Sequence, residues 1–136
     1  MRVYVDTSAA SKLIVREAES AALIEYLDAA VAAGVDLVSS LLLETELRRV
    51  AVRLNLSQVA VSDVLDRVQL ALPDRLLYRD AGLLSGANLR SLDALHVAAA
   101  LRLEAREIIS YDRKQTEAAK NHGLRTVAPA SEDDDH

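Results

Sequence analysis

Four acidic residues stand where predicted helices and strands begin or end, and together they could perform chemistry. Asp6 and Asp112 each follow a short apolar run that is predicted to be a strand. Asp93 lies in the first turn of a predicted apolar helix, and Glu46 lies in the helix that follows another predicted strand. Open parallel sheets bind ligands beyond the carboxyl ends of their strands. We therefore expect these four carboxylates to meet at one rim of a parallel sheet.

Carboxylates that meet at one rim repel one another unless protons or cations neutralise them. Two unit charges about 4 Å apart interact by roughly 4 kcal/mol at an effective dielectric constant near 20. Mg²⁺ and Mn²⁺ prefer oxygen ligands, and they keep waters that can bridge to phosphate oxygens. A divalent ion in such a site favours hydrolysis of a phosphodiester. No Ser-His-Asp order, Walker loop or G-x-G-x-x-G run indicates a different chemistry, and the chain has only 4 glycines.

Each acid also has a purely structural explanation. Asp112 opens the segment DRKQ, in which Gln115 completes a helix-capping pattern, and Asp6 could also cap a helix. The helix dipole favours an acid in the first turn, where Asp93 lies, by roughly 0.3–1 kcal/mol. Glu46 could form a surface ion pair with an arginine at helical spacing. The sequence pattern alone leaves both interpretations open.

Three other polar residues are close to the acids in the sequence or in the predicted fold. His96 follows Asp93 by three residues, and we expect it to be a hydrogen-bonded residue of the core or rim rather than a catalytic group. Lys12 and Arg16 lie four residues apart on the first predicted helix. They could be solvated, or they could steer the phosphates of a nucleic acid toward the rim.

The predicted helices and strands alternate along the chain, which indicates an α/β fold. Such a pattern predicts parallel strands joined by right-handed crossovers, and hence a three-layer sandwich with a short sheet flanked by helices. Strands are predicted at 3–5, 35–40, 107–111 and 124–129, with a short strand or extended segment at 75–79. Helices are predicted at 10–17, 19–33, 41–54, 57–72, 91–105 and 112–123.

The composition indicates one domain. Of the 136 residues, we expect 1–130 to fold as a single domain and the acidic segment 131–136 to be disordered. The chain contains no cysteine for a disulfide or a thiolate metal site, which suits the cytoplasm. No apolar run approaches the roughly 18–20 residues of a membrane span, so we expect no membrane association. The net charge of −5 argues against general electrostatic adhesion to DNA or RNA.

Four segments resemble the sequence blocks of the PIN domain, and more narrowly those of VapC toxins from bacterial VapBC toxin–antitoxin pairs. They are VYVDTSAASKLIVRE at 3–17, SSLLLETELRR at 39–49, LRSLDALHVAAALRL at 89–103 and IISYDRKQTEAAKNHGLRTVAPA at 108–130. The blocks occur in the family's order and cover nearly the whole chain. Any one block is weak evidence, whereas the four blocks together, including LDALH and YDRK after a strand, are specific.

The resemblance implies a PIN-like fold and a metal-dependent endoribonuclease, a hydrolase that acts as the toxin of a type II pair. It also implies Mg²⁺ or Mn²⁺ as cofactor, a homodimer, and inhibition by a VapB-like antitoxin whose C-terminal segment covers the cleft. Asp6, Asp93 and Asp112 match the family's aspartates and would be metal ligands or would order waters bound to the metal. Glu46, rather than Glu44, matches the family's glutamate, and it would complete the set or position the attacking water.

Two serines near the acids also match hydroxyl residues of the family. Ser8 follows the first acid, and Ser110 precedes the last one. Each would orient a ligand or the substrate at most. Many relatives have Thr near the last acid where this chain has SYD, so the role of Ser110 stays open.

Two alternatives predict a similar fold with a different function. A phosphoacceptor receiver-like domain is also α/β with acids at its rim, but it usually has two acids after the first strand and a lysine after the last. This chain has one acid in VDTS and no lysine in TVAP. A non-catalytic PIN-like binding module would share the fold, but the intact set of four acids argues against it.

Overall fold

The computed structural model of this chain describes residues 1–130. These residues form a five-stranded parallel sheet and seven helices, which confirms the predicted α/β class. The segment 131–136, predicted to be disordered, lies outside the described residues. Within residues 1–130, none of the helices combines the length and the apolar character that crossing a bilayer requires.

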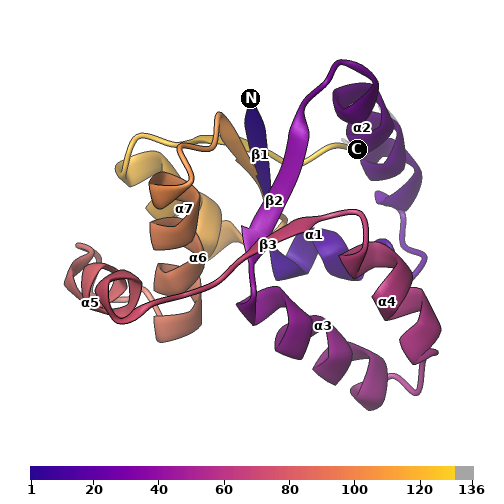
Figure 1. Cartoon of the computed structure of the whole chain (residues 1–136), viewed down its shortest axis with the longest axis horizontal. Helices are drawn as coiled ribbons and strands as arrows, with labels where there is room; N and C mark the ends of the chain where they lie inside the picture. The colour runs from indigo at the N-terminus through magenta and orange to yellow at the C-terminus, as the bar shows by residue number, and fades with distance from the viewer. Residues whose placement is uncertain (131–136) are drawn as a thin grey trace.

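The sheet brings the ends of its central strands to one edge. Its strands are β1 (Arg2–Val5), β2 (Asp36–Ser40), β3 (Gln69–Ala71), β4 (Glu107–Ile109) and β5 (Arg125–Val127). They are ordered β3-β2-β1-β4-β5, so that β1 lies at the centre (Figure 1). Parallel pairing places Val5 beside Ile109, and Tyr4 beside Val38. The residues that follow β1, β2 and β4 therefore leave the sheet at the same edge.

The helices cover both faces of the sheet. They are α1 (Thr7–Ser11), α2 (Ser20–Ala32), α3 (Leu42–Arg53), α4 (Gln58–Leu65), α5 (Arg75–Leu83), α6 (Ser91–Arg102) and α7 (Arg113–Asn121). Successive side chains of a strand point to opposite faces. Val3 and Val5 therefore pack with the buried residues of α1–α4, whereas Tyr4 packs with those of α5–α7. Figure 1 shows these two groups of helices on opposite sides of the sheet.

Two helices are shorter than the sequence predicts. The helix predicted at 10–17 ends at Ser11, because the following segment turns back and the Ser20 hydroxyl donates a hydrogen bond to the Lys12 carbonyl (2.8 Å). The helix predicted at 57–72 ends at Leu65. Residues Gln69–Ala71, which were predicted to belong to this helix, instead form the edge strand β3 and pair with β2.

The strand or extended segment predicted at 75–79 is wrong, because these residues begin α5. The Asp74 side chain caps this helix by accepting the backbone N–H of Leu77 (2.9 Å). Leu77 and Ala81 are buried four residues apart, which is the spacing of a helix that packs one face on the core. The run RLLYR is too short for its own pattern to separate a helix from a strand.

Helix α3 offers a direct test of this packing, because Leu47 is fully buried and Val52 is 55% exposed. We expect Leu47→Ala to lower the free energy of unfolding by about 2–5 kcal/mol, since it leaves a cavity in the core. The control Val52→Ala should change it by less than about 0.5 kcal/mol. Urea denaturation followed by circular dichroism measures both, and equal effects would contradict the placement of α3.

Candidate active site

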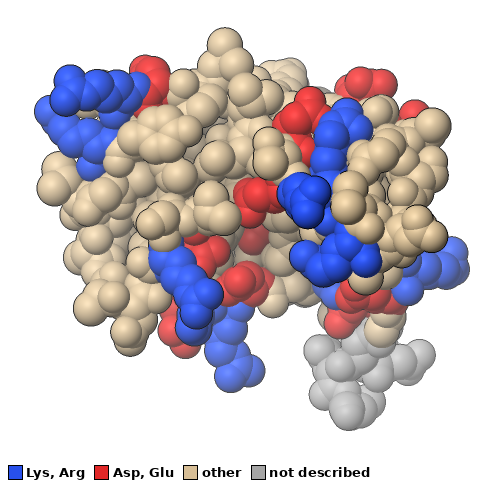
Figure 2. All heavy atoms as spheres, turned by 90° about the horizontal axis from the view of Figure 1, so that it is seen from below, with Lys and Arg blue, Asp and Glu red and all other residues tan. Residues whose placement is uncertain are grey.

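One small cavity at the carboxyl edge of the sheet collects all four predicted acids. Its volume is about 100 Å³. Figure 2 shows the molecule from below the view of Figure 1, and acidic atoms gather near the middle of this face with Lys and Arg side chains around them. The cavity is lined by Asp6, Thr7, Ser8, Glu46, Asp93, His96, Asp112 and Gln115. We call it the acidic pocket.

Asp6 is a buried carboxylate that accepts hydrogen bonds on both oxygens. It caps α1, and its Oδ1 accepts the N–H of Ala9 (2.9 Å) and the hydroxyl of Ser8 (2.7 Å). Its Oδ2 accepts the side-chain N–H of Gln115 (2.8 Å). Burial raises the pKa of the Asp6 carboxyl, and hydrogen bonds from Ser110, Ala9 and Ser8 oppose that rise. The donors therefore offset part of the cost of placing a charge in the interior.

Asp112 caps a helix and also lines the acidic pocket. Its Oδ1 accepts the N–H of Gln115 (3.1 Å) at the start of α7. Asp112 and Asp6 thus each cap a helix and also line the pocket, so the structural explanation and the functional one are compatible for both. Gln115 joins the two acids, because its backbone binds one and its side chain binds the other.

Two serines connect the ends of β1 and β4 beneath the pocket. Ser8 donates to Asp6 and accepts the backbone N–H of Tyr111 (2.8 Å). Ser110 accepts the backbone N–H of Asp112 (3.1 Å), and the two serine hydroxyls lie 3.3 Å apart. These contacts fix the first and last acids relative to each other.

Asp93 lies in the first turn of α6 and is only partly buried. This partial burial raises the pKa of the Asp93 carboxyl, and the Asp112 carboxylate raises it further. Glu46 acts in the same direction. Asp112 and Glu46 therefore both disfavour the charged form of Asp93.

Glu46 reaches the pocket from α3 and accepts two hydrogen bonds on Oε1. The donors are the Thr7 hydroxyl (3.0 Å) and Nε2 of His96 (2.6 Å). Its neighbour Glu44 does not line the pocket and pairs with Arg48 instead. Of the two glutamates weighed from the sequence, Glu46 is thus the one that the structure brings to the acids.

Lys12 is occupied by other side chains, whereas Arg16 is exposed. The Lys12 ammonium binds Glu17 (2.6 Å) and Glu19 (3.0 Å) and lies over the ring of Tyr111. These partners hold the loop after α1, so they account for Lys12 without a role in steering a nucleic acid. Arg16 stays available for such a role.

Three further residues that were not predicted from the sequence contact the site: Tyr4, Thr7 and Gln115. Tyr4 belongs to β1 and is fully buried, and its hydroxyl is 2.7 Å from Nδ1 of His96. Thr7 directly follows Asp6 in the sequence, and this position would have been enough to predict that Thr7 lies at the site. Gln115 was recognised only as part of a capping pattern, and nothing local in the sequence predicts its contact with Asp6, which is 109 positions away.

The acidic pocket has the donor chemistry for a hard divalent ion. Its carboxylate and hydroxyl oxygens suit Mg²⁺ or Mn²⁺, and His96 is engaged with Tyr4 and Glu46. Within residues 1–130, no three His, Asp or Glu side chains are close enough to hold one ion directly. Mg²⁺ usually binds through one or two carboxylates and keeps several waters, so this arrangement fits it.

Comparison with known proteins gives the family. The model of the PIN domain matches residues 3–121. This chain belongs to the PIN domain family. Two relatives from Mycobacterium tuberculosis are named ribonucleases: VapC47 is 33% identical over 95% of this chain and 98% of its own length, and VapC46 is 36% identical over 94% and 98%. The match removes the receiver-like alternative and leaves the non-catalytic PIN module.

Two solved structures of PIN-family toxins share the fold. The crystal structure of Mycobacterium tuberculosis VapC20, described as a toxin that cleaves the sarcin-ricin loop, has a TM-score of 0.72 and 17% identity, covering 93% of this chain and 99% of that one. VapBC2 from Rickettsia felis, bound to a promoter DNA fragment, has a TM-score of 0.70 and 16% identity, covering 93% and 98%. At these identities the likeness shows the fold alone.

The pKa shifts predict how stability depends on pH without divalent ions. Because the native state raises the pKa of Asp6 and Asp93 above the ordinary 3.8, it binds protons more tightly than the unfolded state. The contribution of these groups to stability is present below the ordinary pKa and is lost as pH rises through the native pKa. Urea denaturation in EDTA should therefore show a loss of stability as the pH rises above about 4, and this loss should be smaller in Asp93→Asn.

The matched control is Asp63→Asn, an exposed residue of α4 outside the pocket. It should keep the pH dependence of the unmodified protein. If Asp93→Asn and Asp63→Asn gave the same pH dependence, the proposed electrostatic repulsion at Asp93 would be absent.

Proposed function

We propose that this protein is a metal-dependent endoribonuclease that hydrolyses RNA phosphodiester bonds and acts as the toxin of a type II toxin–antitoxin pair. The observation that carries the proposal is the acidic pocket itself, which gathers Asp6, Glu46, Asp93 and Asp112 from four different elements. Membership of the PIN family and the similarity to VapC ribonucleases support the substrate class.

The proposed cofactor is Mg²⁺, with Mn²⁺ as a possible substitute. Asp6, Asp93 and Asp112 would hold the ion, directly or through water molecules. When bound, the ion supplies positive charge that stabilises the scissile phosphate and the departing oxygen. Ser8, Gln115 and the backbone N–H groups at the starts of α1 and α7 keep Asp6 and Asp112 oriented toward the pocket. Glu46 would accept a hydrogen bond from the attacking water and so position it.

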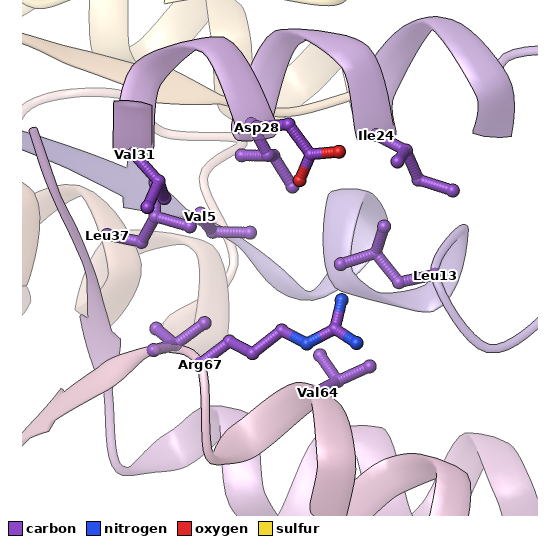
Figure 3. A pocket seen from close by; sticks show the side chains of 10 residues that line it. Val5, Leu13, Ile24, Asp28, Val31, Leu37, Val64 and Arg67 are labelled. Carbon is purple, nitrogen blue, oxygen red and sulfur yellow. The ribbon is translucent and has the colours of Figure 1, made fainter. Parts of the chain in front are cut away.

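The proposed partner is a VapB-like antitoxin, because the VapBC2 structure shares this fold. We place an apolar segment of the antitoxin in a groove between α2 and α4, which has a volume of about 600 Å³ (Figure 3). Ile24 and Val31 line it and are 45% and 56% exposed. Figure 3 shows Arg67 extending into the space between Leu13 and Val64. Within residues 1–130 Arg67 forms no ion pair, so an acidic group on the antitoxin would complement it.

The homodimer and the cytoplasmic location that the resemblance implies stay predictions. So does coverage of the cleft by the C-terminal segment of the antitoxin. The groove is lined by Val5, which directly precedes Asp6, and by Leu13, which follows α1, so a partner that fills the groove can extend toward the acidic pocket.

The activity is tested with purified protein, single-stranded RNA and Mg²⁺. We expect cleavage that EDTA abolishes and that Asp93→Asn lowers by roughly 10²-fold or more, the scale seen when a group that stabilises transition-state charge is lost. Asp63→Asn should cut like the unmodified protein. Calorimetric titration with Mg²⁺ and the cleavage assay together separate the alternatives, since the ribonuclease would bind the ion and cut RNA, whereas a non-catalytic module would bind the ion without cutting. Cleavage that survives EDTA or Asp93→Asn would refute the site.

The groove is tested with a candidate VapB-like antitoxin sought among the genes beside that of this chain, co-expressed and purified. Ile24→Asp should weaken its binding by roughly tenfold or more, because a buried aliphatic contact contributes about 1.5–3 kcal/mol. Val59→Asp makes the same kind of change on the exposed face of α4, outside the groove, and should leave the affinity unchanged. Equal affinities for the two variants would place the antitoxin elsewhere.

A further inference from the structure

A buried chain of hydrogen bonds runs from the centre of the sheet to Glu46. His96 is only 2% exposed, and both of its ring nitrogens are engaged. Its Nδ1 is 2.7 Å from the hydroxyl oxygen of Tyr4, and its Nε2 is 2.6 Å from Oε1 of Glu46. The rings of Tyr4 and His96 meet edge to face, at an angle of 75°. The three residues come from β1, α6 and α3, so the chain spans three separate elements.

The surroundings of the Tyr4 hydroxyl decide where the protons lie. The ordinary pKa of a tyrosine hydroxyl is about 10, so Tyr4 carries its proton at neutral pH. Its oxygen accepts the backbone N–H of Ser40 (3.1 Å). We assign the Tyr4 proton to the hydrogen bond with Nδ1 of His96, so that Nδ1 is the unprotonated nitrogen of a neutral imidazole. The imidazole proton is therefore on Nε2 and is donated to Glu46.

The two oxygens of Glu46 consequently differ. Oε1 accepts both the Nε2–H of His96 and the hydroxyl of Thr7. Within residues 1–130, no hydrogen bond to Oε2 is found. One oxygen is thus fixed by the protein, and the other is free to accept a hydrogen bond in the acidic pocket.

We propose that Tyr4 and His96 are positioning residues, which hold Glu46 in one orientation with Oε2 directed at the attacking water. The proposal rests on the endoribonuclease function proposed above. It adds two residues outside the acidic set and assigns different roles to the two Glu46 oxygens. Residues that orient a functional group through a second contact commonly affect activity by about 10–100-fold.

The test compares two substitutions that each remove one tyrosine hydroxyl hydrogen-bonded to another side chain, buried at Tyr4 and partly buried at Tyr26. Tyr4→Phe breaks the chain to Glu46, whereas Tyr26→Phe removes the hydroxyl that donates to Glu107 at the opposite end of β4, far from the pocket. We expect Tyr4→Phe to lower kcat for RNA cleavage by about 10–100-fold, with KM changed less than about threefold. Tyr26→Phe should lower stability but leave kcat unchanged. Equal kcat values for the two variants would overturn the proposal.

The conservative variant His96→Gln provides a rescue experiment. A glutamine amide can donate to Glu46 from near the position of Nε2, whereas His96→Ala leaves no donor. We expect His96→Gln to retain more kcat than His96→Ala at matched thermal stability. Equal loss in both would show that His96 only fills space.

A measurement on the unmodified protein keeps the inference independent of RNA cleavage. The ¹⁵N chemical shifts of the His96 ring distinguish the two neutral tautomers, and we expect the proton on Nε2. A proton on Nδ1 would overturn the proposal whether or not the protein cuts RNA. If the proton is on Nε2 but the protein does not cut RNA with Mg²⁺, the proposed function would be refuted, whereas the hydrogen-bond chain would still hold.

Discussion

Mutual repulsion among carboxylates in one small pocket is the constraint on which the site depends. Asp6 lies in the interior, and burial raises its pKa, so the charged form is costly. The protein offsets this cost with donors from three directions: the start of α1, the Ser8 hydroxyl and the Gln115 amide. Asp93 has no such set of donors, and its pKa is raised by partial burial and by neighbouring acids. What remains uncompensated is the negative charge that a divalent ion would neutralise.

The fold supplies the rigidity that this repulsion requires. Four acids enter the pocket from the starts of α1, α6 and α7 and from within α3, and each helix is packed against the sheet through a buried apolar face. Successive side chains of β1 point to opposite faces of the sheet, so Val5 packs in one half of the core and Tyr4 packs in the other. Tyr4 therefore serves the core and the site together, because its ring packs with α6 while its hydroxyl contacts His96. The backbone positions that carry the carboxylates are therefore held by the packing of both layers.

The sequence predicted most of the fold and the acidic set, since both depend on local patterns. Strand ends followed by an acid indicated the rim, and the resemblance to a PIN domain selected Glu46 over Glu44. The errors fell where short segments depend on distant partners. Nothing within 69–71 shows that these residues pair with β2, and the helix at Arg75–Leu83 follows from the Asp74 cap and from burial against α6. The hydrogen bonds among Tyr4, His96 and Glu46 join residues 50 and 92 positions apart, which no local pattern encodes.

The central claim is that the acidic pocket takes up a divalent ion, and anomalous scattering from crystals grown with Mn²⁺ tests it most directly. The account predicts one strong anomalous peak in the pocket, with Asp6, Asp93 and Asp112 around it and Glu46 facing an ordered water. A saturating concentration of Mn²⁺ that leaves the pocket without a peak, or that places the ion on another face of the molecule, would contradict it.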